Sequence, residues 1–149
     1  MKILHINLFD AGLDAAVRAC LDACAPNLPR ENRCVSATDA HGLVTAYRQP
    51  EFRALLESFH WVLPDGMPSV WLGKLKGATG MTRCYGPDFF KRILSESADQ
   101  PVTHFFCGGK EGVADQLKAA VARKWDNRRV VGTYCPPFRE MSDEELKTL

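Results

Sequence analysis

The sequence lacks a long hydrophobic run. None of its windows approaches the roughly 18 to 20 consecutive apolar residues of a membrane-spanning helix. The first residues, MKILHINLFDAGLD, hold one lysine and a short apolar stretch that His5 and Asn7 interrupt, so they do not form the hydrophobic region of a signal peptide. We therefore expect a cytoplasmic protein.

The sequence also lacks an excess of either charge. Lys and Arg number 19 and Asp and Glu 18, which gives a formal net charge of +1, and the densest basic cluster is NRR at residues 127–129. A nucleic-acid-binding protein usually carries a basic stripe, so we expect no nucleic-acid partner. The length of 149 residues fits one domain, 1–149, with a single core.

A third absence concerns cysteine pairs. No Cys-x-x-Cys occurs, and Cys20 and Cys24 have no histidine at ligand spacing, which argues against structural zinc. Cytoplasmic thiols stay reduced. We therefore expect small, buried thiols at all six positions, which are Cys20, Cys24, Cys34, Cys84, Cys107 and Cys135.

What the sequence does contain is a regular alternation of short apolar runs and amphipathic segments. The apolar runs predict strands at residues 2–8, 33–37, 60–64, 102–106 and 128–134. Apolar residues at helical spacing predict helices at residues 13–24, from about 40 with a restart at Pro50, 70–75, 86–94 and 113–121. This order is typical of βαβ units. The predicted fold class is α/β, a Rossmann-like, mostly parallel sheet with helices on both faces.

The last residues predict a helix that has only begun where the sequence stops. Ser142 and Glu145, three positions later, form a capping box at the front of SDEELKTL. A helix of about two turns is marginal unless it is packed. We therefore expect a truncated chain, the front portion of a longer protein.

The stretch LPDGMPSVW places a carboxylate between a predicted strand and a predicted helix. Pro64, Asp65 and Gly66 are strong turn formers, and the local sequence alone favours a solvated turn aspartate. The alternative is functional, because open α/β sheets bind ligands at the carboxyl ends of their strands. Asp65 is then a candidate catalytic residue.

Glycines follow a later predicted strand, in FFCGGKEGV. Gly108 and Gly109 let a ligand approach the backbone closely, and the first N–H groups of the next helix favour an anion such as a diphosphate, beside Lys110. Neither G-x-x-x-x-G-K-[ST] nor G-x-G-x-x-G fits the stretch. A turn that only permits tight packing of strand and helix is equally compatible with these residues.

Two further segments lie near predicted strand ends or helix starts. Asp39 and His41 follow the second predicted strand, and GPD at residues 86–88 opens a predicted helix. Both have an ordinary structural explanation: the first segment can be a solvated loop, and the second can be a helix start. Because parallel strands end at one edge, we expect Asp39, Asp65 and the glycine turn to lie at the same edge.

A cysteine-dependent hydrolase is a competing interpretation. Cys107 ends a predicted strand that also carries His104. A nucleophile elbow would need glycine where Phe105 stands, and residues three apart on a strand point to opposite faces. The pattern therefore argues against a catalytic cysteine.

Four blocks of the sequence resemble successive blocks of the WecG/TagA/CpsF glycosyltransferase family, in the family's order and with similar spacing. They are AYRQPEFRALLESFHWVLPDGMPSVWLGKLKG, RCYGPDFFKRIL, THFFCGGKEGVADQLKAAV and VVGTYCPPF. The resemblance runs from about Val35 to the C-terminus. Four ordered blocks are more specific than one motif, and they favour a catalytic Asp65 over a turn residue.

The resemblance implies transfer of a sugar, N-acetylmannosamine or a related hexose, from a UDP-sugar to a polyprenyl-diphosphate-linked acceptor in surface polysaccharide or teichoic acid synthesis. It implies Asp65 as the catalytic base. The resemblance also implies that no catalytic metal is needed, and the absence of a D-x-D motif agrees with this. We therefore expect no metal and no cofactor. Substrate-binding roles are implied for Asp39, His41, Gly66, Gly86, Pro87, Asp88, Gly108, Gly109, Lys110 and Tyr134.

The sequence departs from the family in two ways. Many members carry Thr-x-Asn after the second strand, where this chain has Ala37, Thr38 and Asp39, which leaves the sugar open. The family also continues beyond this chain into a basic appendage that docks on the membrane. We expect membrane contact only through that part, at the inner face of the membrane, and leave homo-oligomerisation open. A nucleotide-binding module without transferase activity is the alternative function.

Overall fold

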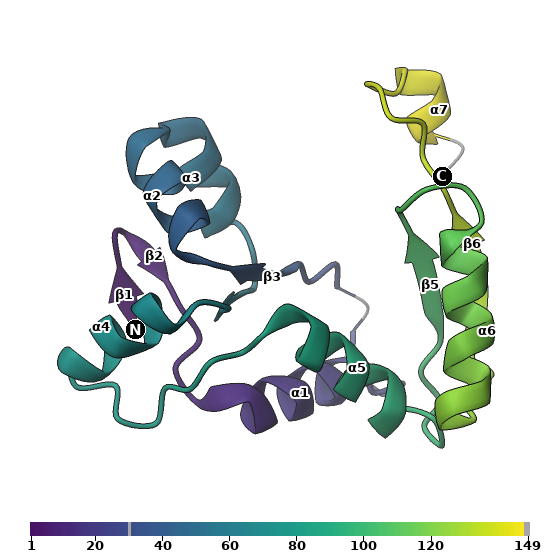
Figure 1. The fold of residues 1–149 in the computed structure, drawn as a ribbon, viewed down its shortest axis with the longest axis horizontal. Helices are drawn as coiled ribbons and strands as arrows, with labels where there is room; N and C mark the ends of the chain where they lie inside the picture. The colour runs from purple at the N-terminus through teal and green to yellow at the C-terminus, as the bar shows by residue number, and fades with distance from the viewer. Residues whose placement is uncertain (30, 148–149) are drawn as a thin grey trace. The chain divides into compact units, whose positions relative to one another are not determined.

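The computed structural model describes residues 1–29 and 31–147. The chain divides into two compact units, Met1–Ile93 and Leu94–Leu149, and both combine helices with short strands (Figure 1). The predicted α/β class is confirmed, while the single domain over 1–149 stays a prediction. None of the described helices is long and apolar enough to cross a membrane.

The first unit is built around two parallel strands, β3 (Val35–Thr38) and β4 (Trp61–Pro64), which pair along their whole length. Leu8 adds a parallel bridge to Val62 of β4. Helices connect these strands, and α3 starts at Pro50 as predicted, because proline suits the first turn of a helix. The helices are α1 (Gly12–Ala23), α2 (Ala40–Arg48), α3 (Pro50–Glu57), α4 (Met67–Leu75) and α5 (Gly86–Glu96).

Strand β4 buries side chains on both of its faces. Val62 packs in one cluster with Leu43 of α2 and Leu56 of α3. The next residue, Leu63, packs in a second cluster with Ala16 of α1. Neighbouring residues of a strand point to opposite faces. Helices therefore cover both faces of this pair, as the sequence predicts.

The N-terminal segment differs from the prediction. Instead of one strand over residues 2–8, the chain forms an antiparallel hairpin of β1 (Lys2–Ile3) and β2 (Ile6–Asn7). Leu4 and His5 make the turn, with φ angles of 45° and 75°. Two-residue hairpin turns need such positive φ angles and are usually marked by Asn or Gly. Neither residue is of that kind, so the sequence carries no turn signal.

The second unit also contains one parallel pair. β5 (His104–Cys107) pairs with β6 (Val130–Tyr134), and α6 (Val113–Trp125) packs against both strands. On the other face Phe105 is 57% exposed and Val131 65% exposed. The buried cluster of this unit consists of Leu94, Phe106, Ala114, Val121 and Val130.

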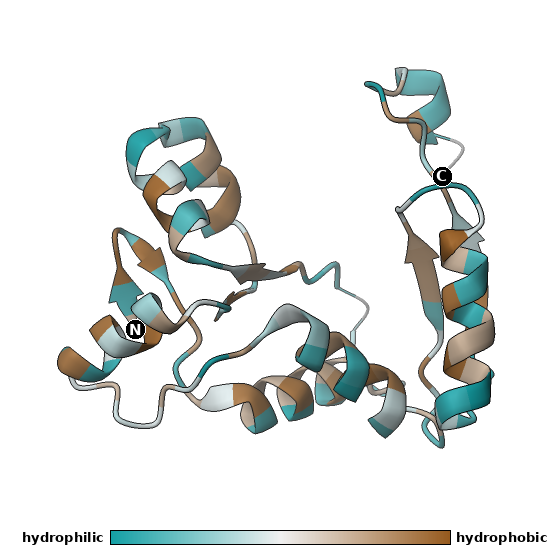
Figure 2. Cartoon of the chain, in the orientation of Figure 1, coloured by the Kyte–Doolittle hydropathy of each residue, from teal (hydrophilic) through white to brown (hydrophobic). Residues whose placement is uncertain are grey.

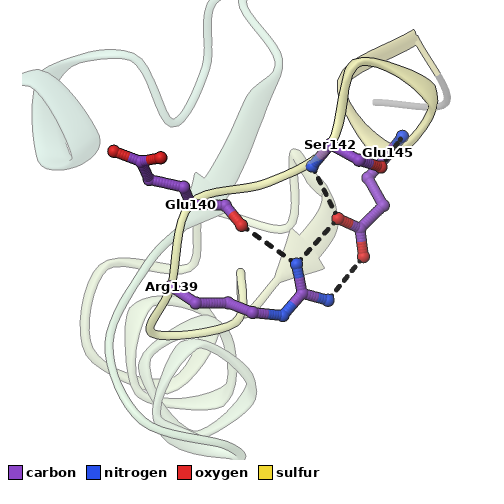
Figure 3. A network of polar contacts seen from close by, with 4 residues as sticks. All are labelled: Arg139, Glu140, Ser142 and Glu145. Carbon is purple, nitrogen blue, oxygen red and sulfur yellow. Dashed lines mark hydrogen bonds and ion pairs between the residues drawn. The ribbon is translucent and has the colours of Figure 1, made fainter.

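The described residues end in a short helix, α7 (Asp143–Lys147). The predicted capping box is formed: the N–H of Ser142 donates to Oε2 of Glu145 at 2.9 Å, and the N–H of Glu145 donates to Oγ of Ser142 at 3.3 Å. Arg139 joins it through Nη2, 2.7 Å from Oε1 of Glu145 (Figure 3). The rest of the predicted helix, residues 148–149, lies outside the described residues.

The prediction that all six cysteines are buried is wrong. Cys84 is buried and Cys20 is partly so, whereas four thiols are exposed, those of Cys24, Cys34, Cys107 and Cys135. The exposed ones lie where an element begins or ends, such as the last residue of β5, and there the chain leaves the core. Small apolar side chains at such positions escape burial.

Candidate functional site

Asp65 lies where β4 ends. Its backbone N–H donates to the carbonyl of Thr38 at 3.1 Å, which ties it to the end of β3. Pro64 is the last residue of β4 and Gly66 is the N-cap of α4, so the Pro-Asp-Gly turn separates strand from helix. The side chain is 23% exposed. The carboxylate therefore stands at the carboxyl edge of two parallel strands, where α/β folds bind ligands.

Two groups direct this carboxylate. The N–H of Gly86, the first residue of α5, donates to Oδ1 of Asp65 at 3.3 Å. Nη2 of Arg83 lies 3.7 Å from the same oxygen, and Nε of Arg83 donates to the carbonyl of Asp65. The guanidinium also lies over the ring of Tyr85, 4.3 Å from its centroid. Backbone and side chain of Asp65 are thus both held from the loop before α5.

The turn after β3 touches the turn after β4. Asp39 is the N-cap of α2, and its Oδ1 accepts the N–H of Gly42 at 2.9 Å. A Cβ placed on Gly66 would lie 3.8 Å from Cα of Asp39, and one on Gly86 would lie 3.2 Å from Cβ of Ala37. The structure thus brings Asp39, Gly66 and Gly86 to the surroundings of Asp65. A common edge with Gly108 and Gly109, which belong to the second unit, stays a prediction.

Three other predicted residues lie in the first turns of helices. His41 is exposed in α2, and Pro87 and Asp88 are exposed in α5. They follow Asp39 and Gly86 closely along the chain. Their positions are those of helix starts, and their predicted contacts with a substrate stay predictions.

A buried thiol lies beside the same edge. The N–H of Cys84 donates to the carbonyl of Pro64 at 2.8 Å. Burial, and then the negative charge of Asp65, raise the pKa of Cys84 to about 11. The thiol therefore stays protonated at neutral pH, which suits packing rather than nucleophilic chemistry.

The glycine turn in the second unit has the backbone that only glycine adopts easily. Gly108 and Gly109 have φ angles of 118° and 80°. The N–H of Gly108 donates to the carbonyl of Tyr134 at 2.9 Å, and Sγ of Cys135 donates to the carbonyl of Gly109 at 3.3 Å. These two bonds attach the turn to the end of β6.

A pocket of about 910 Å³ opens at this turn. Lys110 brings a positive charge to its wall and Glu111 a negative one. Phe138 is fully exposed in the same wall, so its ring is available to a planar ligand. The lining residues are Gly109, Lys110, Glu111, Cys135, Pro136, Pro137 and Phe138.

Sequence reasoning misses two parts of these sites. Arg83 opens the block RCYGPDFFKRIL, but nothing local indicates that it contacts Asp65. The CPPF segment at residues 135–138 carries a usable signal, because it follows β6 as GGK follows β5. Adjacent parallel strands deliver both segments to one edge.

The structure gives the competing hydrolase interpretation no support. Nε2 of His104 is 2.8 Å from Oγ of Ser97, so the ring is engaged by that hydroxyl. Cys107 lies at the exposed end of β5.

Within residues 1–29 and 31–147, no group of three His, Cys, Asp or Glu side chains is arranged to hold a metal ion.

Two comparisons relate the chain to known proteins. A family model described as the glycosyl transferase WecG/TagA/CpsF family matches residues 1–149. An N-acetylglucosaminyldiphosphoundecaprenol N-acetyl-beta-D-mannosaminyltransferase of Bacillus spizizenii is 28% identical over 102 residues, which are 66% of this chain. The chain spans 40% of the length of that relative.

Proposed function

The chain belongs to the WecG/TagA/CpsF family of glycosyl transferases, and on that premise we propose that it takes part in moving a sugar from a UDP-sugar to a lipid-diphosphate-linked acceptor. The sugar would be N-acetylmannosamine or a related hexose. The relative from Bacillus spizizenii is named for an acceptor and a sugar of these kinds. The product would belong to a surface polysaccharide or a teichoic acid.

The observation that carries the proposal is the setting of Asp65. A carboxylate that is partly buried at a strand edge, and directed by Gly86 and Arg83, has the fixed orientation that a general base needs. A residue that served only as a turn former would not need a guanidinium held beside it.

The pocket at the glycine turn supports the donor half of the proposal. Lys110 and the start of α6 favour a diphosphate, and no side chain caps that helix at Gly112. The exposed ring of Phe138 offers a stacking surface for a nucleobase. Glu111 opposes an anion, so the diphosphate would lie on the Lys110 side.

The reaction then follows from these roles. The acceptor hydroxyl oxygen attacks the anomeric carbon of the sugar, and the bond from that carbon to the diphosphate breaks. Asp65 accepts the hydroxyl proton, and UDP leaves with the electron pair of the broken bond. The N–H groups at the uncapped start of α6 stabilise the charge that develops on the leaving group.

A nucleotide-binding module without transferase activity is the second candidate. The observation that favours it is that the pocket is lined by residues of the second unit alone. Under this alternative the chain binds UDP but transfers no sugar. Self-association and a peripheral position at the inner membrane face stay predictions.

The test is Asp65→Asn, because an amide preserves the turn but cannot accept the proton. We expect a loss of roughly 10²- to 10⁴-fold in turnover. Sugar release onto a lipid-diphosphate acceptor is measured in the 149-residue chain and in a chimera that continues into the Bacillus spizizenii relative. Asp99→Asn is the matched control, since this carboxylate is exposed elsewhere. If Asp65→Asn and the unaltered chain were equally stable and had equal turnover, Asp65 would be a turn residue and not the base.

A further inference from the structure

Helix α4 is apolar on two opposite faces but packs with only one of them. Its buried face contains Ser69, Val70 and Gly73. A helix that is hydrophobic all round is normally buried all round. In this helix the opposite face is exposed, and its large apolar side chains are Met67 (39% exposed), Trp71 (64%), Leu72 (41%) and Leu75 (86%).

Three of these side chains form one continuous stripe. Met67, Trp71 and Leu75 are four residues apart, and with 3.6 residues per turn they lie along one side of the helix. We call these three residues the α4 stripe. Figure 2 shows hydrophobic residues on α4 in brown. Single exposed apolar residues are ordinary, but a contiguous group marks an interaction site.

Along the chain, the charges that follow the start of α4 are basic, and the acidic residue just before it, Asp65, faces Arg83 at 3.7 Å. Residues 66–87 contain Lys74, Lys76 and Arg83 and no acidic residue. Nζ of Lys76 lies 2.9 Å from the carbonyl of Lys2, which places a third lysine near the C-terminal end of α4. An apolar stripe with tryptophan and flanking lysines has the composition of a helix that lies in a lipid–water interface.

We propose that the α4 stripe docks on a membrane surface that contains anionic lipids. Met67, Trp71 and Leu75 enter the interface, and the lysines contact the lipid headgroups. Asp65 precedes α4 by two residues, so docking brings it to the surface where a lipid-linked acceptor lies. The docking itself does not depend on the transferase proposal, and it places a membrane contact within the residues of this chain.

Charge favours lipid over a second copy of the chain as the partner. Two α4 stripes packed in parallel would bring Lys74 and Lys76 of both copies near one another, and residues 66–87 hold no acidic residue to pair with them. Like charges that face each other oppose association. Anionic headgroups complement the same lysines.

The test is sedimentation of the 149-residue chain with vesicles, without any sugar nucleotide. We expect binding to vesicles of phosphatidylcholine with phosphatidylglycerol, and weaker binding to phosphatidylcholine alone or at high salt. The double variant Trp71→Glu/Leu75→Glu should bind about 10- to 100-fold more weakly. The matched control is Tyr47→Glu/Leu55→Glu, since both of its side chains are 56% exposed on α2 and α3.

Fluorescence gives a second readout. Trp71 emission should shift to the blue with anionic vesicles, and Trp71→Phe should remove the shift while keeping the binding. Failure to bind the vesicles, equal loss in the control variant, or a dimer in sedimentation velocity that Leu75→Glu dissolves would each overturn the proposal. Circular dichroism melting establishes that the variants are folded.

Discussion

The two parallel strand pairs follow the same plan and end differently. After β3 and β4 come carboxylates that backbone N–H groups hold, Asp39 by Gly42 and Asp65 by Gly86. After β5 and β6 come glycines and prolines around a pocket of about 910 Å³. One edge thus presents oriented carboxylates, and the other presents an open pocket that a ligand can enter.

This difference suits the two edges to different functions, proton transfer and ligand binding. Oriented carboxylates suit proton transfer, in which geometry at the reacting atom matters most. An open glycine-lined pocket suits binding, because the backbone can approach a ligand without side-chain obstruction. Variants at the first edge should then change turnover, and variants at the second should change affinity.

After Asp65→Asn, the largest effect that sharpens this comparison is expected for Arg83→Ala. The change removes the guanidinium beside Asp65 and lets the carboxylate turn away from its productive direction, which should lower kcat roughly 10- to 100-fold. UDP affinity should stay the same. Steady-state kinetics and calorimetry measure the two quantities. Arg128→Ala is the control, since that side chain is 83% exposed, and an Arg83→Ala enzyme with full kcat would contradict the positioning role.

The second edge is tested by Lys110→Ala. Loss of one charged contact to a diphosphate should weaken UDP binding about 10-fold. Titration calorimetry should also show UDP bound in preference to ADP. Turnover at saturating donor should change little. Lys118→Ala, an exposed lysine of α6 outside the pocket lining, is the control, and equal weakening by both variants would argue against a specific phosphate contact.

The sequence predicts those parts of the sites that lie directly at strand ends. Asp39, Asp65 and Gly108 all follow apolar runs, and the order of strands and helices is enough to assign them to strand ends. The N-terminal hairpin could not be predicted, because Leu4 and His5 turn the chain with positive φ angles that their side chains do not favour.

Arg83 could not be predicted for a different reason. It stands 18 residues after Asp65 and reaches it only because the loop folds back on β4, where the N–H of Cys84 meets the carbonyl of Pro64. CPPF at residues 135–138 becomes a pocket wall only through the pairing of β5 with β6. Local patterns carry neither long-range contact, although the position of CPPF after a predicted strand indicates the edge at which it lies.

The two units should also differ in their response to acid. Burial lowers the pKa of His104 in the second unit. Below the ordinary pKa of about 6.5 the unfolded chain takes up a proton before the folded one, so stability falls as the pH drops through that value towards the lowered pKa. Hydrogen exchange, corrected for intrinsic rates, should show β5 losing protection between pH 7 and pH 5 while β4 keeps it.

His104→Gln should remove this difference, because glutamine does not titrate. His60→Gln is the control in the first unit, at an exposed histidine. If β5 in the His104→Gln variant still lost protection on acidification, another group would be responsible for the effect.

The smallest effect is expected at the end of the described chain, for Glu145→Gln. Hydrogen bonds from Arg139 and Ser142 lower the pKa of Glu145 to about 2. Their stabilising contribution is present above the unfolded pKa near 4.5 and is lost as the pH falls towards 2. Because both partners are exposed, the variant should release α7 without changing the melting temperature of either core.

Glu140→Gln is the control, since only its backbone carbonyl meets Arg139. Hydrogen exchange at residues 143–147 measures the loss, and a drop in overall melting temperature with Glu145→Gln would mean that α7 stabilises the cores of the units.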